Sequence, residues 1–425
     1  METQTQTNTQ ETPKKSTAQP VLLQERVGSI DAIRGFALLG ILIINMAVFS
    51  GPATYFHILG KGFWGELTGF WNTAIVSFTD VFVAGKFYTM FAFLFGLGFF
   101  IFFERAKEKT NNPRMLFYKR LCILLLIGLV HAFFVWSGDV LTAYALFGFL
   151  LPFFFNRNPK TILRWAFGIF IGFLLVMAMI FGSLALTKMA YPDILSDASQ
   201  TLFDDMESRI AASFQAFRYG TFAEIQAQRV SDTLFLLPNI FAAGFIIFPL
   251  FLLGLYAGKK GLFQNTEANL PTLKKIWLWG LIVGLPLSVV KFISGNLKAG
   301  DIYSFFEVVH IGAGFFGDLG LALFYMTSLV LLYQKRKQIF APLGYAGRMA
   351  LSNYLFQSIV CVFIFYSFGL GFYGQIGPAL GLALTLAIFV VQVYLSKLWL
   401  QRYQYGPVEW LWKSLTYGKF FKIKN

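Results

Sequence analysis

His131 and Asp139 are two polar side chains in an otherwise apolar stretch that reads GLVHAFFVWSGDVLTAYALFG. The short turn WSGD between them would make the flanking helices antiparallel neighbours, so the two side chains can meet at one level. A carboxylate that accepts the His Nδ1–H fixes the tautomer and leaves Nε2 able to take a proton. The pair has the pattern of an oriented general base. The alternatives are an interhelical hydrogen bond, commonly worth about 0.6 kcal/mol, or an Asp139 that only caps its helix.

The first apolar stretch, SIDAIRGFALLGILIINMAVFS, carries further polar candidates. Asp31 and Arg34 are three residues apart and share a helix face. They form either a capping and snorkelling pair or a place where Arg34 contacts the phosphate of a cytoplasmic ligand. Asn45 lies about four turns farther along the helix, at the level expected for His131. Its amide could donate a hydrogen bond to an oxyanion.

A polar stripe marks a second apolar stretch, GYAGRMALSNYLFQSIVC. Arg348, Asn353 and Gln357 recur there at helical spacing, and such a stripe either joins helices or lines a cavity. Lys86 follows a break at Gly85 and could reach the same interior. A charged side chain deep in a bilayer costs at least ~2.5 kcal/mol, so each of these residues needs a partner or a cavity. We favour a cavity and expect the three stripe residues, Arg34 and Lys86 to bind substrate or cofactor.

His57, Glu307 and His310 are secondary candidates. Glu307 and His310 share a helix face, but one E-x-x-H pair without further ligands does not indicate a metal. We therefore expect a polar contact or a proton relay at this pair, and no metal site. His57 lies in an expected outer loop and reads as an ordinary loop residue when taken alone. No phosphate-binding loop, nucleophile elbow or dinucleotide fingerprint occurs in its required context.

The composition indicates a membrane protein. Of 425 residues, 56% are hydrophobic and only 13% are charged, against about 25% charged in soluble domains. Several uncharged runs reach the ~20 residues that a bilayer-crossing helix needs. The net charge of +14 comes from basic clusters between apolar runs, which is the positive-inside pattern. We expect an all-α polytopic bundle whose partner is the lipid bilayer, and no binding of nucleic acid.

The apolar runs predict about ten transmembrane helices. They fall at residues 30–50, 71–103, 115–136, 139–156, 161–187, 233–257, 274–295, 302–333, 340–368 and 377–399. The second run is interrupted at Ala84 to Phe87 and could hold a surface or re-entrant piece before one crossing. Basic segments follow at 104–120, 157–164, 259–275 and 335–337 and at the chain end. Placing all of them in the cytoplasm requires an even number of crossings, with both termini cytoplasmic.

Five parts of the chain follow from these runs. They are a disordered polar tail (1–27), N-terminal membrane helices with His131 and Asp139 (28–187), an extracytoplasmic amphipathic loop (188–232), C-terminal membrane helices (233–405) and a basic cytoplasmic segment (406–425). In the loop, Phe203, Met206, Ile210, Phe214 and Phe217 recur at helical spacing. The residues TFAE, Thr221 to Glu224, predict a capping box that starts another helix.

Several segments together resemble the YeiB-type proteins of the bacterial inner membrane. They are DAIRGFALLGILIIN, GKFYTMFAFLFGLG, HAFFVWSGDVLTAYALFG, AGRMALSNYLFQS and GPVEWLWKSLTYG. The first segment is also similar to the first helix of transmembrane acyltransferases such as heparan glucosaminide N-acetyltransferase, in which a luminal His follows about a dozen residues later. Asn45 and His57 fall at a comparable spacing. The resemblance implies acyl transfer across a bacterial inner membrane, with acyl-coenzyme A as a co-substrate and no covalently bound cofactor.

Three functions remain open at this stage. As an acyltransferase, the chain would hold the carrier phosphates with Arg34, Lys86 and Arg348, and His131 with Asp139 would deprotonate an extracytoplasmic acceptor. As a transporter or flippase for an amphipathic anion, the same residues would line a path for a small or lipid-like substrate. As a scaffold, the chain would dock partners on its outer loop, and a homodimer stays open.

Overall fold

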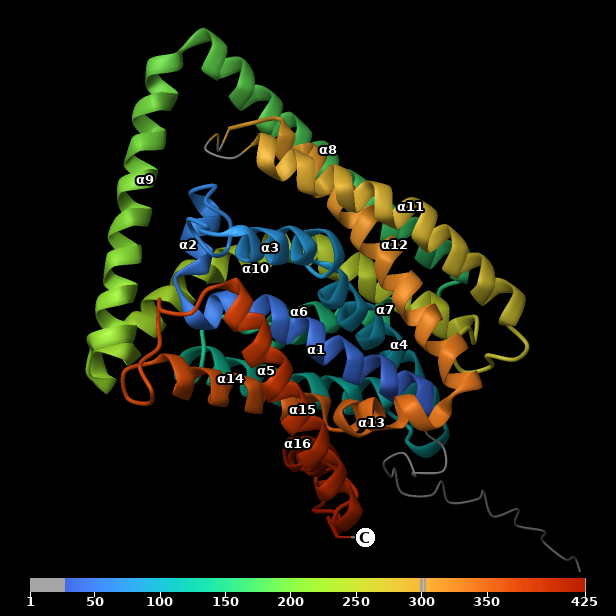
Figure 1. Cartoon of the computed structure of the whole chain (residues 1–425). Helices are drawn as coiled ribbons and strands as arrows, with labels where there is room; N and C mark the ends of the chain where they lie inside the picture. The colour runs from blue at the N-terminus through green and yellow to red at the C-terminus, as the bar shows by residue number, and fades with distance from the viewer. Residues whose placement is uncertain (1–26, 299–300, 302, 425) are drawn as a thin grey trace, which may run out of the picture.

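The computed structural model describes residues 27–298, 301 and 303–424, and nearly the whole predicted tail lies outside them. Helices make up the described fold apart from one isolated bridge between Tyr403 and Lys424. The helices are α1 (Gly28–Ser50), α2 (Ala53–Ile58), α3 (Phe70–Phe82), α4 (Lys86–Lys109), α5 (Pro113–Phe134), α6 (Leu141–Gly148), α7 (Leu151–Phe154), α8 (Pro159–Ala190), α9 (Pro192–Phe214), the π-helix η2 (Gln215–Tyr219), α10 (Phe222–Lys259), α11 (Leu270–Leu297), α12 (Phe306–Lys335), α13 (Lys337–Arg348), α14 (Ala350–Phe365), α15 (Pro378–Arg402) and α16 (Pro407–Tyr417). This confirms the all-α membrane bundle (Figure 1).

The number of long membrane helices corrects the prediction of ten. Within the described residues, eight helices are long and apolar enough to cross a bilayer, or nine if α13 and α14 count as one span bent by 75°. The predicted span 139–156 instead forms α6, of eight residues, and α7, of four. Phe155, which follows α7, packs on Phe103 of α4 at 4.3 Å between ring centroids. Hydropathy detected the apolar run but not its break.

The interruption predicted near Gly85 is present. α3 and α4 form one 40-residue apolar stretch that is broken there. Gly85 has φ +90°, and a Cβ at this position would lie 1.8 Å from the Asp318 carboxylate. Only glycine fits both the positive φ and the close approach.

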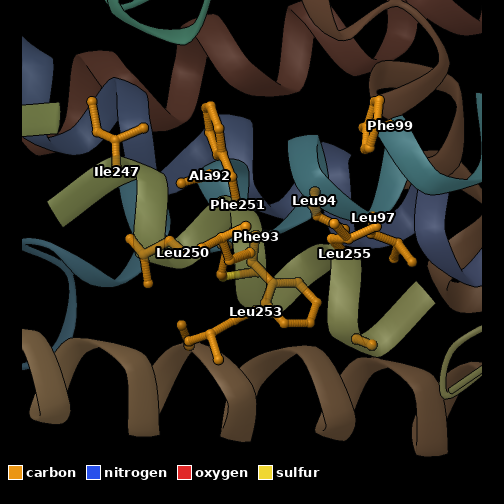
Figure 2. Packing of buried hydrophobic residues seen from close by; sticks show 14 of the residues in the cluster. Ala92, Phe93, Leu94, Leu97, Phe99, Ile247, Leu250, Phe251, Leu253 and Leu255 are labelled. Atoms are coloured by element: carbon orange, nitrogen blue, oxygen red, sulfur yellow. The ribbon is translucent and has the colours of Figure 1, made fainter. Parts of the chain in front are cut away.

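The packing of α4 on α10 forms the centre of the largest apolar core. Figure 2 shows Phe93, Leu94 and Leu97 of α4 against Leu250, Phe251 and Leu253 of α10. The helices approach closely because glycines face the partner backbone. A Cβ on Gly96 would lie 1.9 Å from the Phe251 carbonyl oxygen, and one on Gly254 would lie 1.9 Å from that of Phe93. Small residues at such crossings are typical of membrane helices.

The predicted amphipathic helix of the loop is α9, continued by η2. Figure 1 shows α9 running from the end of α8 past α2. Its apolar face packs inward, with Met206 beside Tyr55 and Leu59. The predicted capping box at Thr221 and Glu224 forms, but it starts α10 itself. The helix that follows the loop therefore begins at Phe222 rather than at 233.

Candidate binding cavity and the His131–Asp139 pair

The expected contact between His131 and Asp139 forms. His131 lies in the last turn of α5, and Asp139 lies just before α6. Nδ1 of His131 lies 2.9 Å from Asp139 Oδ1, with side chains only 1% and 2% exposed. The carboxylate can only accept, so Nδ1 carries the proton. Asp139 Oδ2 also accepts the Thr142 backbone N–H at 2.7 Å, so the residue caps α6 and orients the imidazole at once.

The second imidazole nitrogen of His131, Nε2, is the one that could accept a proton. Nε2 is buried and has no hydrogen-bond partner within the part of the chain that the structure describes. Two aromatic rings flank the imidazole, Tyr354 at 5.2 Å and Trp136 at 6.2 Å between ring centroids. Leaving a buried polar atom without a partner costs about 1–3 kcal/mol. A basic nitrogen kept in this state can accept a proton from a bound group.

Side chains of α10 hold the end of α5 that carries His131. Gln226 donates to the carbonyl oxygen of residue 133, Arg229 to that of 134, and Thr233 to that of 132. The last carbonyl groups of a helix have no partner within it, and a cation there interacts favourably with the helix dipole. These three bonds therefore fix the last turn of α5, and with it the position of His131.

A cavity of about 700 Å³ opens among α1, α4, α5, α14 and α16. This volume is within the range of sites for small molecules and cofactors, about 300–1,000 Å³. Its lining is charged where α1 begins and where α4 ends, and is apolar beyond. We call the charged part the basic end, defined by Arg34, Arg105, Arg120, Arg348 and Lys413.

The basic end has an excess of positive charge. Five basic side chains line the cavity against two acidic ones, Asp31 and Glu409, a net charge of +3. Asp31 pairs with Arg34 at 2.8 Å. Glu409 accepts hydrogen bonds from the first backbone N–H groups of α14 and from Ser352. Both carboxylates are thus engaged locally, and the cavity is suited to an anion.

α16 covers the basic end. Its Trp412 donates from Nε1 to the Arg120 carbonyl oxygen at 2.8 Å. The same indole ring lies 3.7 Å from the Arg120 guanidinium, a cation–π contact. Stacking fixes the direction of the guanidinium, so it is presented to the cavity in a defined orientation.

The opposite end of the cavity reaches the neighbourhood of the His131–Asp139 pair. Asn45, Gly138 and Tyr354 line it there, and apolar side chains of α1 and α4 line the middle. His131 does not line the cavity itself, and its ring lies behind that of Tyr354 at 5.2 Å. Asn45, Arg34 and Arg348 therefore lie along one cavity whose far end adjoins His131.

Lys86 lies outside this cavity. It is fully buried and pairs with Asp318 at 2.8 Å, and Lys291 pairs with the other oxygen of the same carboxylate at 2.7 Å. Both ammonium groups also donate to the carbonyl oxygen of Ala84. The break between α3 and α4 leaves carbonyl groups without helical partners, and these lysines supply the donors.

Asn353 and Gln357 join helices and do not line the cavity. Asn353 donates to the Ala346 carbonyl oxygen and to Ser396 of α15. Gln357 donates to Gln392 of α15 at 2.8 Å. Sequence alone could not separate the two uses of a polar stripe, because that depends on the partner helix.

The three secondary candidates lie apart from the cavity. His57 is exposed on α2 and stacks on Phe63 at 4.4 Å between ring centroids. Glu307 pairs with Lys298, and His310 contacts the Lys291 carbonyl oxygen through Nδ1 at 3.0 Å. Among the described residues, no group of three His, Cys, Asp or Glu side chains could hold a metal ion.

Three basic residues of the cavity were not singled out from the sequence: Arg105, Arg120 and Lys413. Arg105 and Arg120 belong to the basic segment 104–120, and Lys413 belongs to the basic chain end. In the sequence, both segments indicate only the orientation of the membrane helices. The signal that points to these cavity residues is a basic side chain close to an apolar run.

Comparisons with known proteins give relatives along nearly the whole chain. The family described as "Protein of unknown function (DUF418)" matches residues 257–419. The "Uncharacterized protein YxaH" of Bacillus subtilis is 35% identical over 423 residues, which cover 95% of this chain and 97% of the relative. A similar match is the "Uncharacterized 39.9 kDa protein in amylase 3'region" of Bacillus acidopullulyticus, 28% identical over 95% of this chain and 97% of its own. The "Uncharacterized protein YeiB" of Escherichia coli is 26% identical over 92% of this chain and 96% of its own.

Proposed function

We propose a function from the cavity of this chain, which belongs to the DUF418 family and is a multi-pass membrane protein. Its bacterial relatives YxaH and YeiB carry no functional name. We propose that the protein transfers an acyl group from a cytoplasmic carrier to an extracytoplasmic acceptor. The observation that carries the proposal is the single cavity that joins the basic end to the surroundings of His131 and Asp139. The predicted likeness to YeiB-type proteins is confirmed.

The orientation follows from charge. Basic segments cluster where α4 ends, where α8 begins and between α12 and α13. The positive-inside rule assigns such short basic segments to the cytoplasm. The basic end and both termini are then cytoplasmic, and His131 lies toward the outer face. The bacterial relatives support a cytoplasmic, or inner, membrane as the location.

The donor that fits this cavity is an acyl thioester whose carrier bears phosphates, such as acyl-coenzyme A. Its phosphates would be held at the basic end, where Arg34 and Arg348 can form charge-assisted hydrogen bonds. The apolar middle of the cavity would take the extended arm of the carrier. The thioester carbonyl would then lie near Asn45 and Tyr354.

The reaction uses His131 as a general base, which requires the Tyr354 ring to move aside, because His131 does not line the cavity in this structure. Nε2 takes a proton from the acceptor hydroxyl or amine as its oxygen or nitrogen attacks the thioester carbonyl carbon. Asn45 donates a hydrogen bond to the developing oxyanion. The C–S bond then breaks, the acyl group stays on the acceptor, and the proton on Nε2 passes to the leaving thiolate. Asp139 stabilises the imidazolium throughout.

Binding of a donor tests the proposal directly. Detergent-purified protein should bind acyl-coenzyme A, and Arg34→Gln or Arg348→Gln should weaken binding about tenfold or more, since hydrogen bonds to charged groups are worth about 1.5–3 kcal/mol. Arg114→Gln is the matched control, because Arg114 is exposed and does not line the cavity. No saturable binding, or equal losses in the control, would refute the proposed donor site.

Transport remains a second candidate because one observation favours it. The membrane helix broken at Gly85 resembles the discontinuous helices of transporters, and it has buried Lys86 and Asp318 and partly buried Lys291 at the break. Under this alternative, liposomes containing the protein would show a proton-coupled anion flux that Glu307→Gln abolishes. If the flux survives His131→Ala, and neither the wild-type protein nor the variant transfers an acyl group, transport would be favoured over the first proposal.

A further inference from the structure

A second, smaller cavity lies on the other side of the turn between α5 and α6. Its volume is about 30 Å³, and Trp136 and Ser137 of the turn line it. The Trp136 ring also covers Gly138, where an added Cβ would lie 2.4 Å from the indole, and Gly138 lines the large cavity. The indole therefore separates the two cavities, with its ring 6.2 Å from that of His131.

The wall of the small cavity carries a buried carboxylate with neutral direct partners. Asp232 is 7% exposed, and Oδ1 accepts hydrogen bonds from the Tyr55 hydroxyl and the Gln228 amide, both at 2.7 Å. In the described part of the chain, no cationic group pairs with Asp232 within 4.0 Å. A buried charge is costly unless it is paired.

Two guanidinium groups act on Asp232 from farther away, and both are committed elsewhere. Arg209 pairs with Asp205 at 2.9 Å. Arg229 donates to the end of α5 and to Gln226. Hydrogen bonds to the carboxylate use Oδ1, so Oδ2 is available to a further donor.

Aromatic rings enclose the rest of the cavity. Its lining includes the rings of Tyr55, Trp136, Phe217, Phe235, Tyr366 and Tyr373. Phe217 stacks on Tyr366 at 4.4 Å between ring centroids, and Tyr366 meets Tyr373 edge-on at 5.9 Å. Ring faces attract cations, so a carboxylate among them suits an organic cation.

The size of the cavity selects among cations. A cavity holds one water molecule when about 10–15 Å³ is open to the centre of a water-sized sphere. By that measure this cavity offers about 30 Å³, which is room for two or three groups of that size. A primary ammonium group and the carbon that carries it fit, whereas the four heavy atoms of a trimethylammonium group do not. A neutral hydroxyl would fit by size, but it would leave Asp232 without a cation in direct contact.

We propose that this cavity, with Asp232 as its anion and the surrounding rings as its walls, binds the primary ammonium group of a small amine on the outer face. The bound ammonium group is not the nucleophile of the proposed acyl transfer, because it has no lone pair and Trp136 lies between this cavity and the imidazole of His131. Its binding therefore does not depend on the proposed function.

Binding to the detergent-purified full-length protein tests the site without any acyl donor. Ethanolamine should bind saturably. Ethylene glycol lacks the charge, and choline has a larger head group. Both should bind at least about tenfold more weakly than ethanolamine, a difference of about 1.4 kcal/mol in binding free energy. Equal binding of ethylene glycol would refute the charge requirement, and equal binding of choline would refute the size requirement. Failure of ethanolamine to bind would refute the amine site, and it would leave the test of the donor cavity unaffected.

Two variants locate the binding. Asp232→Asn keeps the shape and should lower ethanolamine affinity at least about tenfold. Asp193→Asn, an exposed change at the start of α9, is the control. If Asp232→Asn does not fold, Ser213→Val serves instead, because Ser213 lines the cavity and the added methyl groups fill it without changing a charge. Unchanged affinity in a folded Asp232→Asn or Ser213→Val protein would overturn the proposal.

Discussion

Asp139→Asn is the substitution that separates orientation of His131 from simple packing. The carboxylate and the imidazole are 2.9 Å apart and nearly fully buried, so no water replaces the lost charge. Asn keeps an oxygen that can accept the Thr142 N–H, and the cap of α6 survives. Its NH₂ group would then face Nδ1 as a donor. The proton on the imidazole would move to Nε2, and the base would be lost.

The size of the effect follows from this geometry. General base catalysis contributes about 10²–10⁴-fold, so we expect kcat for acyl transfer to fall by about that factor. The free energy of unfolding should fall by no more than about 1.5–3 kcal/mol, the worth of one hydrogen bond to a charged group, because the cap remains. Donor affinity should not change, since the basic end lies at the other end of the cavity.

The assay compares kcat, donor Kd and melting temperature of the wild-type protein, Asp139→Asn and His131→Ala. We expect a fall in kcat in both variants with an unchanged donor Kd, and a changed pH profile in Asp139→Asn. If Asp139→Asn keeps kcat within about threefold of the wild type while it remains folded, Asp139 does not orient a base. The contact would then be an interhelical hydrogen bond of the kind commonly worth about 0.6 kcal/mol.

Three further predictions follow from the packing and the charges. Gly254→Ala should lower the melting temperature by an amount equivalent to about 1–3 kcal/mol, because the added Cβ would overlap the backbone of α4. Gly168→Ala, whose Cβ meets open space, should not lower it. Asp318→Leu should destabilise the protein more than Lys86→Met in thermal melts, because it leaves the buried ammonium group of Lys86 and the partly buried one of Lys291 without their anion, whereas Lys86→Met leaves Lys291 paired. Donor affinity should fall with added salt, and the salt dependence should be weaker in Arg34→Gln, as measured by titration at several ionic strengths.

The sequence predicted contacts that are local and missed those that join distant segments. His131 and Asp139 are eight residues apart across a short turn, so helix geometry alone brings them together. Lys86 was expected to line a cavity, but its partner Asp318 lies far along the chain, and no local pattern indicates that pair. The polar stripe had the same ambiguity, because Gln357 could be assigned only once Gln392 was placed beside it.

Helix continuity was also hidden from the sequence. Hydropathy measures composition, so the apolar run 139–156 and a straight helix of that length look alike. The structure divides the run around Phe149, close to Gly148 and Pro152, which weaken helices. Similarly, the bend at Met349 between α13 and α14 lies within one apolar stretch. Tertiary contacts at such breaks supply the partners that the helix backbone loses.

The distribution of charge argues that the large cavity is a site and not a packing defect. Several charged groups away from the cavity occur in compact sets, as with Lys86, Lys291 and Asp318, and with Lys298 and Glu307. Such sets hold helices together, and little net charge remains. The cavity lining instead keeps five basic side chains against two acidic ones. A surplus of that size attracts an anion to the cavity, and loss of donor binding in Arg348→Gln would tie that surplus to the ligand.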